Sequence, residues 1–203
     1  MHLFLTPEIA RYLEIFATFT FIAFLVLQVL HSKYMWYLYI PSCIAAALNF
    51  FDSQTWAFAS LNIYYIVMGF IGIYSWRKDS GKLKEGEELP KGKIALNRLD
   101  RKTALIALAM AVVGVPALFF LLRFLNDPNP FLDSITTTLS IIGTWWLTKS
   151  YIQQWWMWIV ADVFAIWMNV NLGNGWFVFQ FAMCITSSFI GIWNWNRNGR
   201  YVS

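Results

Sequence analysis

The sequence predicts an all-α membrane protein with seven transmembrane helices. Of its 203 residues, 59% are hydrophobic and only 13% are charged, whereas a soluble domain carries about 25% charged residues. The charges are also unevenly distributed, because 14 of the 26 lie within residues 77–102. The rest of the chain has too few polar groups to cover a surface that faces water. This composition excludes an ordinary soluble enzyme, a nucleic-acid-binding domain and a disordered protein.

A membrane-spanning helix needs about 20 mostly apolar residues, and the chain contains seven such segments. In order, they are residues 12–30, 34–51, 56–76, 103–124, 132–148, 155–170 and 176–195. The first, third, fourth and seventh are the clearest. Pro41 is expected to kink the second, three consecutive threonines weaken the fifth, and the short sixth segment is expected inside the bundle. Membrane-spanning strands are not expected, because polar and apolar residues do not alternate.

The distribution of Lys and Arg predicts the orientation of the chain in the membrane. With the N-terminus outside, the inner segments hold 13 of the 15 Lys and Arg residues, and the outer segments keep only Arg11 and Arg123. We therefore expect the C-terminus in the cytoplasm, together with the long loop at residues 79–102. This loop mixes both signs of charge, which favours a solvated linker over a regulatory or lipid-binding segment.

The chain matches itself without gaps at an offset of 119 residues. The run Phe70-Ile-Gly-Ile73 corresponds to Phe189-Ile-Gly-Ile192, and Trp76 corresponds to Trp195. Because each copy has three spans, an odd number, the fourth span is needed to give both copies the same direction. The sequence thus predicts a 3+1+3 parallel repeat. The expected parts are residues 1–78 (first repeat), 79–102 (cytoplasmic loop), 103–130 (linker helix), 131–197 (second repeat) and 198–203 (cytoplasmic tail).

Parallel repeats of this kind are typical of transporters, whose substrate sites tend to lie near the middle of the membrane between the halves. Asp162 is the only acidic residue deep inside a predicted span, where a carboxylate costs about 2.5–3.5 kcal/mol. It shares one helical stripe with Trp155, Trp158 and Asn169. Aromatic rings and a carboxylate can bind a small aromatic or cationic heterocycle. The two indoles also fit a belt at the inner membrane surface, and Asp162 also fits a buried structural partner of a Tyr or Asn.

Three other spans present candidate substrate contacts. Their residues are Trp36 and Tyr39 in the second span, Asn62 and Tyr65 in the third, and Gln180, Ser187 and Asn194 in the seventh. Interhelical hydrogen bonds use the same polar residue types. Gly69 and Gly72 in the third span either allow close helix packing or leave room for a ligand. Cys43 stands where the second copy has Asp162, so the internal symmetry is broken at the acid.

No cofactor or metal site is expected from the sequence. The two histidines, His2 and His31, lie outside the predicted spans, and no glycine-rich nucleotide-binding loop occurs. No nucleophile stands with a base and an orienting group. The chain is therefore not expected to be an enzyme.

The layout and the aromatic motifs together resemble the PnuC family of bacterial vitamin transporters, relatives of the SWEET sugar facilitators. The stretch from Tyr151 to Asp162 is similar to the family's Trp-x-x-Trp-x-x-x-Asn signature, and the run Gly72-Ile-Tyr-Ser-Trp76 is similar to its Tyr-x-Trp ending. The resemblance covers nearly the whole chain. It implies uptake of nicotinamide riboside by facilitated diffusion across the bacterial cytoplasmic (inner) membrane. A cytoplasmic kinase then phosphorylates the vitamin and traps it.

Three positions depart from the family pattern. Asp162 stands where Asn is usual, Asn62 where Gln is expected, and Gly69 where Asn is expected. Nicotinamide riboside and thiamine both carry a positively charged ring that suits Asp162. Nicotinamide riboside is therefore expected first, thiamine second and the neutral riboflavin third. Proton coupling through Asp162 is a second mechanism, and a non-transporting structural subunit is the alternative class. Assembly into a homo-oligomer stays open, and nucleic acid is not an expected partner.

Overall fold

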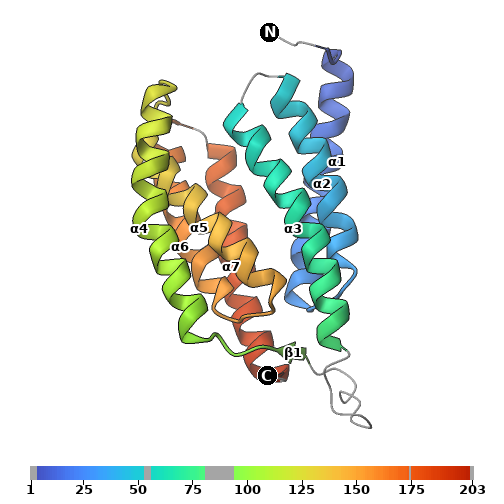
Figure 1. Cartoon of the computed structure of the whole chain (residues 1–203). Helices are drawn as coiled ribbons and strands as arrows, with labels where there is room; N and C mark the ends of the chain where they lie inside the picture. The colour runs from blue at the N-terminus through green and yellow to red at the C-terminus, as the bar shows by residue number, and fades with distance from the viewer. Residues whose placement is uncertain (1–3, 53–55, 81–93, 174, 202–203) are drawn as a thin grey trace. The chain divides into compact units, whose positions relative to one another are not determined.

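The computed structural model describes residues 4–52, 56–80, 94–173 and 175–201. These residues form seven α-helices and two short strands (Figure 1). The elements are α1 (Pro7–Val29), α2 (Met35–Asp52), α3 (Trp56–Ser80), β1 (Ile94–Leu96), α4 (Arg101–Phe124), α5 (Pro130–Thr148), α6 (Gln154–Asn171), α7 (Gly175–Asn198) and β2 (Gly199–Tyr201). Each predicted span corresponds to one helix. By length and composition, α1, α3, α4 and α7 can cross a membrane, and these are the four clearest spans of the sequence.

Local capping chemistry explains where several helices begin. Thr6 caps α1 by accepting a hydrogen bond from the Ile9 amide (3.4 Å), and Asp100 caps α4 by accepting one from the Thr103 amide (2.7 Å). Proline occupies the first turn of α1 and of α5, where its missing N–H is not needed. Pro41 lies inside α2, which continues through it.

α1 and α5 end in the same kind of turn. His31 and Ser150 have positive φ angles of 52° and 53°. The His31 amide donates to the Gln28 carbonyl, and the Ser150 amide donates to the Leu147 carbonyl, both at 3.0 Å. Each residue of the first turn lies 119 positions before its equivalent in the second. The backbone geometry of this turn therefore recurs at the same 119-residue offset at which the sequence matches itself.

The chain divides into two compact units, Met1–Lys84 and Glu85–Ser203. In the first unit α2 packs against both α1 and α3, and the Ser42 hydroxyl of α2 donates to the Ala17 carbonyl of α1 (3.0 Å). In the second unit α6 packs against α5 and α7, and α4 packs against α5. Ala107 of α4 and Trp146 of α5 share one buried hydrophobic cluster. The helix expected to link the two copies thus packs within the second unit.

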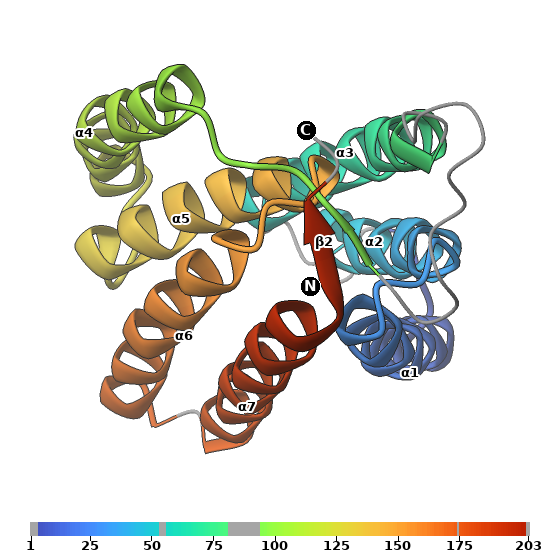
Figure 2. The same cartoon turned by 90° about the horizontal axis from the view of Figure 1, so that it is seen from below.

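Two short strands join the last part of the expected cytoplasmic loop to the expected C-terminal tail. β1 pairs in parallel with β2, with Ile94 beside Gly199 and Leu96 beside Tyr201 (Figure 2). Residues 81–93 of the expected loop lie outside the described residues, but residues 94–96 are bound to the C-terminal segment. The pairing joins two segments far apart in the sequence, so no local residue pattern could predict it.

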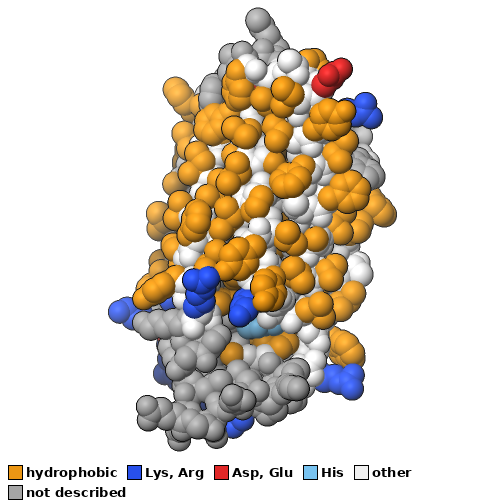
Figure 3. Space-filling view, turned by 90° about the vertical axis from the view of Figure 1, so that its right-hand side faces the viewer, with side chains coloured by type: hydrophobic (Ala, Val, Ile, Leu, Met, Phe, Trp, Pro, Cys, Tyr) orange, Lys and Arg blue, Asp and Glu red, His pale blue; other side chains and the backbone are white. Residues whose placement is uncertain are grey.

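Large hydrophobic side chains cover the outer faces of the helices. Phe124, Val113 and Leu105 of α4 are 82%, 67% and 64% exposed. On the face shown in Figure 3, hydrophobic side chains predominate, and most of the visible Lys and Arg side chains lie toward its lower end. Such a surface is unusual for a soluble protein and is suited to contact with lipid.

Candidate functional site

Asp162 lies in the middle of α6 and is only 6% exposed. Its Oδ2 atom has no hydrogen-bond partner among the described residues. The thiol of Cys184 on α7 lies close enough to interact electrostatically with the carboxylate. An ionised carboxylate is strongly disfavoured in an apolar interior unless a cation or hydrogen-bond donors compensate it. Asp162 therefore presents an oxygen that the described residues leave without a hydrogen bond.

Trp155, two turns before Asp162 on α6, is held against α7. Its side chain is 1% exposed, and a Cβ atom added at Gly191 would overlap its indole ring. The Trp195 ring meets this indole edge-on, with centroids 5.3 Å apart and planes at 80°. Only glycine at position 191 allows α7 to approach the indole so closely.

Trp158 lies against the other neighbouring helix, α5. A Cβ atom added at Gly143 would be 3.2 Å from Cε2 and 3.4 Å from Nε1 of its indole. The two tryptophans that share a stripe with Asp162 therefore contact different helices. Neither indole N–H has a hydrogen-bond partner among the described residues.

The interactions between α6 and α7 show which residues of the two helices lie opposite each other, at the same height along the helix axes. Trp155 lies opposite Gly191, and Asp162 interacts with Cys184. The second pair lies seven residues further along α6 and seven residues back along α7. Since seven residues are close to two full helical turns, both pairs lie on the same face of each helix, and the two helices run in opposite directions.

The predicted residues of α7 lie at different heights relative to Asp162. Gln180 and Ser187 stand about one turn to either side of Cys184, and both are partly buried. Asn194 lies further along the helix. There, the side-chain amide nitrogen (Nδ2) of Asn198 donates a hydrogen bond to Oδ1 of Asn194 (2.7 Å). Of the three predicted residues, Gln180 and Ser187 are thus nearest to the height of the acid.

Two predicted amides are engaged within their own helices. The Asn62 side chain of α3 donates to the Phe58 carbonyl (2.9 Å), and the Asn169 side chain of α6 donates to the Ala165 carbonyl (2.8 Å). Both bonds join residues four positions apart. These donors therefore satisfy backbone carbonyls in the structure as it stands.

The first unit holds a similar aromatic arrangement on α2 and α3. Trp36 is fully buried, and its indole lies over Gly72. Trp76 meets it edge-on, with centroids 5.6 Å apart and planes at 84°. Tyr39 follows one turn later on α2, and its ring lies 6.0 Å from that of Tyr65. Of the four residues predicted in this unit, these three aromatic ones lie together.

Cys184 is the residue beside the acid that the sequence-based selection omits. Its spacing offered a signal, because it lies four residues after Gln180 and three before Ser187, on one helical stripe. Within the described ranges, no three His, Cys, Asp or Glu side chains come close enough to hold a metal ion. The side chains that the structure places around Asp162 on α6 are the indoles of Trp155 and Trp158 and, on α7, the thiol of Cys184.

Comparison with known proteins finds relatives that are named as transporters. Two curated relatives, both named nicotinamide riboside transporter PnuC, come from Neisseria mucosa and Escherichia coli. They are 26% identical over 141 residues and 24% identical over 142 residues. The matches cover 66% and 58% of this chain, but only 52% and 56% of the relatives. The chain thus spans about half the length of these relatives.

A solved structure shares the fold along nearly the whole chain. It is described as the crystal structure of the vitamin B3 transporter PnuC, and it is similar with a TM-score of 0.63 at 22% identity. The similarity covers 95% of this chain and 92% of the other. The family model described as nicotinamide mononucleotide transporter matches residues 11–197. Because this match includes almost every residue of the seven helices, the chain belongs to the nicotinamide mononucleotide transporter family, the family of PnuC.

Proposed function

We propose that this chain is a membrane transporter, not an enzyme, and that it carries nicotinamide riboside by facilitated diffusion. The family and the names of the two relatives support this assignment. The observation that carries it is Asp162, a buried carboxylate without a hydrogen-bond partner for Oδ2 among the described residues. The pyridinium ring of nicotinamide riboside supplies the missing positive charge, and the indoles of Trp155 and Trp158 favour an aromatic cation.

The charges favour the riboside over the mononucleotide named in the family description. A mononucleotide carries a phosphate group, which needs Arg, Lys or a cluster of N–H donors. In α6, which carries the acid, the described residues include no Lys or Arg, and those of α7 include only Arg197, in its last turn. The Asp162 carboxylate would also repel a phosphate. A substrate with a positive ring and no phosphate fits this arrangement better.

The 3+1+3 parallel repeat is part of the proposal. Three observations support it: the turns at His31 and Ser150, the tryptophan over glycine in each unit, and the edge-on second tryptophan. All occur at an offset of 119 residues. On this basis α1–α3 and α5–α7 are two copies of one three-helix bundle. Alternating access then follows from movement of one copy against the other.

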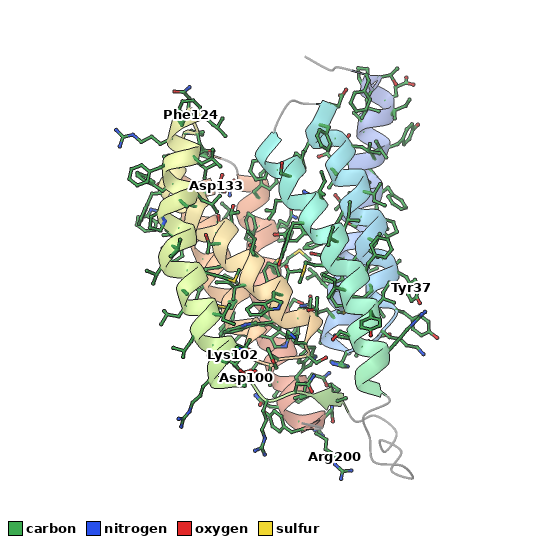
Figure 4. All side chains as sticks on the ribbon, viewed as in Figure 1. Tyr37, Asp100, Lys102, Phe124, Asp133 and Arg200 are labelled. Carbon is green, nitrogen blue, oxygen red and sulfur yellow. The ribbon has the colours of Figure 1, made fainter. Side chains whose placement is uncertain are left out.

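The proposed location is the bacterial inner membrane, with the N-terminus outside and the C-terminus in the cytoplasm. In the second unit, Lys102 and Arg200 lie at one end, and Phe124 and Asp133 lie at the opposite end (Figure 4). Cations at the first end are expected on the cytoplasmic side. Trapping of the substrate by a cytoplasmic vitamin kinase, and assembly into a homo-oligomer, remain proposals from the family resemblance.

Thiamine is the second candidate substrate, because its charged ring satisfies the same carboxylate. Riboflavin, which is neutral, leaves Asp162 uncompensated and ranks third. The proposed substrate contacts also include eight residues of the predicted spans: Trp36, Tyr39, Asn62, Tyr65, Asn169, Gln180, Ser187 and Asn194. Proton coupling through Asp162 is the alternative mechanism, since buried carboxylates serve as proton relays in transporters. It requires that Asp162→Asn makes uptake indifferent to a proton gradient.

The decisive experiment measures binding of nicotinamide riboside to Asp162→Ala by quenching of intrinsic tryptophan fluorescence. We expect the affinity to fall at least tenfold, because a hydrogen bond to a charged group contributes about 1.5–3 kcal/mol. Thiamine and riboflavin are titrated in parallel, and uptake is measured in proteoliposomes. Cys43→Ala, at the equivalent position of the first copy, is the matched control and should bind normally.

Two results would refute the proposal. Normal affinity for nicotinamide riboside in a folded Asp162→Ala variant would show that Asp162 does not bind the substrate. Absence of saturable binding of all three vitamins to folded wild-type protein would favour a structural subunit that transports nothing.

A further inference from the structure

The two proposed copies have different residues at the position of Cys184, which lies opposite Asp162. At the offset of 119 residues, Cys184 corresponds to Tyr65, and Asp162 corresponds to Cys43. In the first copy, therefore, a thiol stands on the middle helix and a phenol ring on the third helix. In the second copy, a carboxylate stands on the middle helix and a thiol on the third.

Both pairs lie at the same height in their copies. Cys43 comes seven residues after Trp36, and Tyr65 comes seven residues before Gly72, on which Trp36 lies. The same steps lead from Trp155 and Gly191 to Asp162 and Cys184, which interact. The first copy thus fills this height with an aromatic ring. The second replaces the ring with one of the smallest side chains and adds a carboxyl group.

We propose that Cys184 is a further specificity-determining residue, whose small side chain lets the positively charged ring of the substrate reach Oδ2 of Asp162. This inference rests on the proposed function and adds a size limit at one position to it. Oδ2 has no protein donor among the described residues, and its side chain is more than nine-tenths buried. A tyrosine at position 184, as in the first copy, would occupy the approach from α7.

The test is a volume series at position 184 in the full-length protein. Cys184→Ala should bind nicotinamide riboside within about threefold of wild type, because the thiol is not required as a ligand. Cys184→Tyr, which copies the first bundle, should bind at least tenfold more weakly. Met183→Tyr adds the same ring at the neighbouring residue, which is 42% exposed, and should bind normally. Thermal unfolding of each variant verifies that it is folded.

If Cys184→Tyr does not fold, the affinities of Cys184→Val and Cys184→Leu for nicotinamide riboside test the size limit instead. The proposal requires the affinity to fall from Ala to Val to Leu in folded protein. Equal affinities across this series, or tight binding by Cys184→Tyr, would overturn it. Such a result would leave the proposed function intact provided that Asp162→Ala still loses binding. Failure of the wild-type protein to bind would instead refute the function, and this inference with it.

Discussion

In both proposed three-helix copies, the second and third helices pack together through a tryptophan that lies over a glycine. Trp36 of α2 lies over Gly72 of α3, and Trp155 of α6 lies over Gly191 of α7. Both tryptophans are almost completely buried. This contact is the same in both copies although Asp162 of the second stands where the first has Cys43, so the packing of tryptophan on glycine does not depend on the residue at that position.

The contacts between the first and second helices show the same positions with different side chains. In the first copy, the Phe24 and Tyr39 rings lie 4.6 Å apart. The equivalent residues of the second copy are Gly143 and Trp158, which also approach each other closely. The larger indole is accommodated because its neighbour is a glycine. The second copy therefore keeps the geometry of the interface and adds an indole N–H near the acid.

The comparison predicts equal sensitivity at the two glycines that lie under tryptophans. Gly72→Ala and Gly191→Ala should each lower the free energy of unfolding by about 1–3 kcal/mol, because the new Cβ atom overlaps a buried indole. Thermal or denaturant unfolding in detergent measures the effect. Gly191→Ala should also weaken substrate binding, since it displaces Trp155.

The matched control for both substitutions is Gly175→Ala, where an added Cβ atom meets nothing within 4 Å. Alanine has a higher helix propensity than glycine, by about 1 kcal/mol in a helix interior, so this control should be neutral or slightly stabilising. If Gly191→Ala were as well tolerated as Gly175→Ala while Gly72→Ala was destabilising, the proposed similarity of the two interfaces would be wrong.

A second difference between the copies lies at the end of the second unit that carries the strands. Next to the β1–β2 pair, the Asn97 side chain donates to the Lys149 carbonyl at the turn between α5 and α6 (2.9 Å). A Cβ atom at Gly199 would collide with Leu96 and with the Trp195 carbonyl. Gly199→Ala should therefore open the strand pair without unfolding the helices.

Hydrogen exchange measures this opening at the amides of the two strands. We expect lower protection of β1 and β2 in Gly199→Ala, with a loss on the order of 1 kcal/mol in local opening free energy. The amides in the middle of α6 should keep their protection. A loss of protection throughout α4–α7 would contradict a local role for the strand pair.

Much of the fold was predictable, because each helix corresponds to one of the mostly apolar spans of the sequence. The contact of Trp36 with Gly72 also recurs at the 119-residue offset, between Trp155 and Gly191. The role of Gly72 was not predictable, since sequence allows either close packing or room for a ligand, and the structure places the Trp36 indole over it. The bond of Asn62 to its own helix and the nearness of Cys184 to Asp162 depend on side-chain rotamers and helix rotation, which residue spacing does not determine.

The smallest predicted effect compares the caps of α1 and α4. Thr6 caps α1 with a neutral hydroxyl, whereas Asp100 caps α4 with a carboxylate. The backbone N–H and the hydroxyl of Thr103 donate to this carboxylate and hold the pKa of Asp100 below its usual value. A lowered pKa in the folded protein means that the ionised cap stabilises α4 above about pH 4. This stabilisation is lost as the pH falls through the folded-state pKa.

The protection factor of the Thr103 amide should accordingly decrease as the pH falls below about 4, while that of the Ile9 amide at the neutral cap stays constant. Asp100→Asn keeps an acceptor for the Thr103 amide but cannot titrate. In this variant the dependence on pH should vanish, and the protection factor of the wild-type protein should approach that of the variant as the pH falls. A Thr103 protection factor that stays constant over this range in wild-type protein would show that the ionised form of Asp100 adds nothing to the cap.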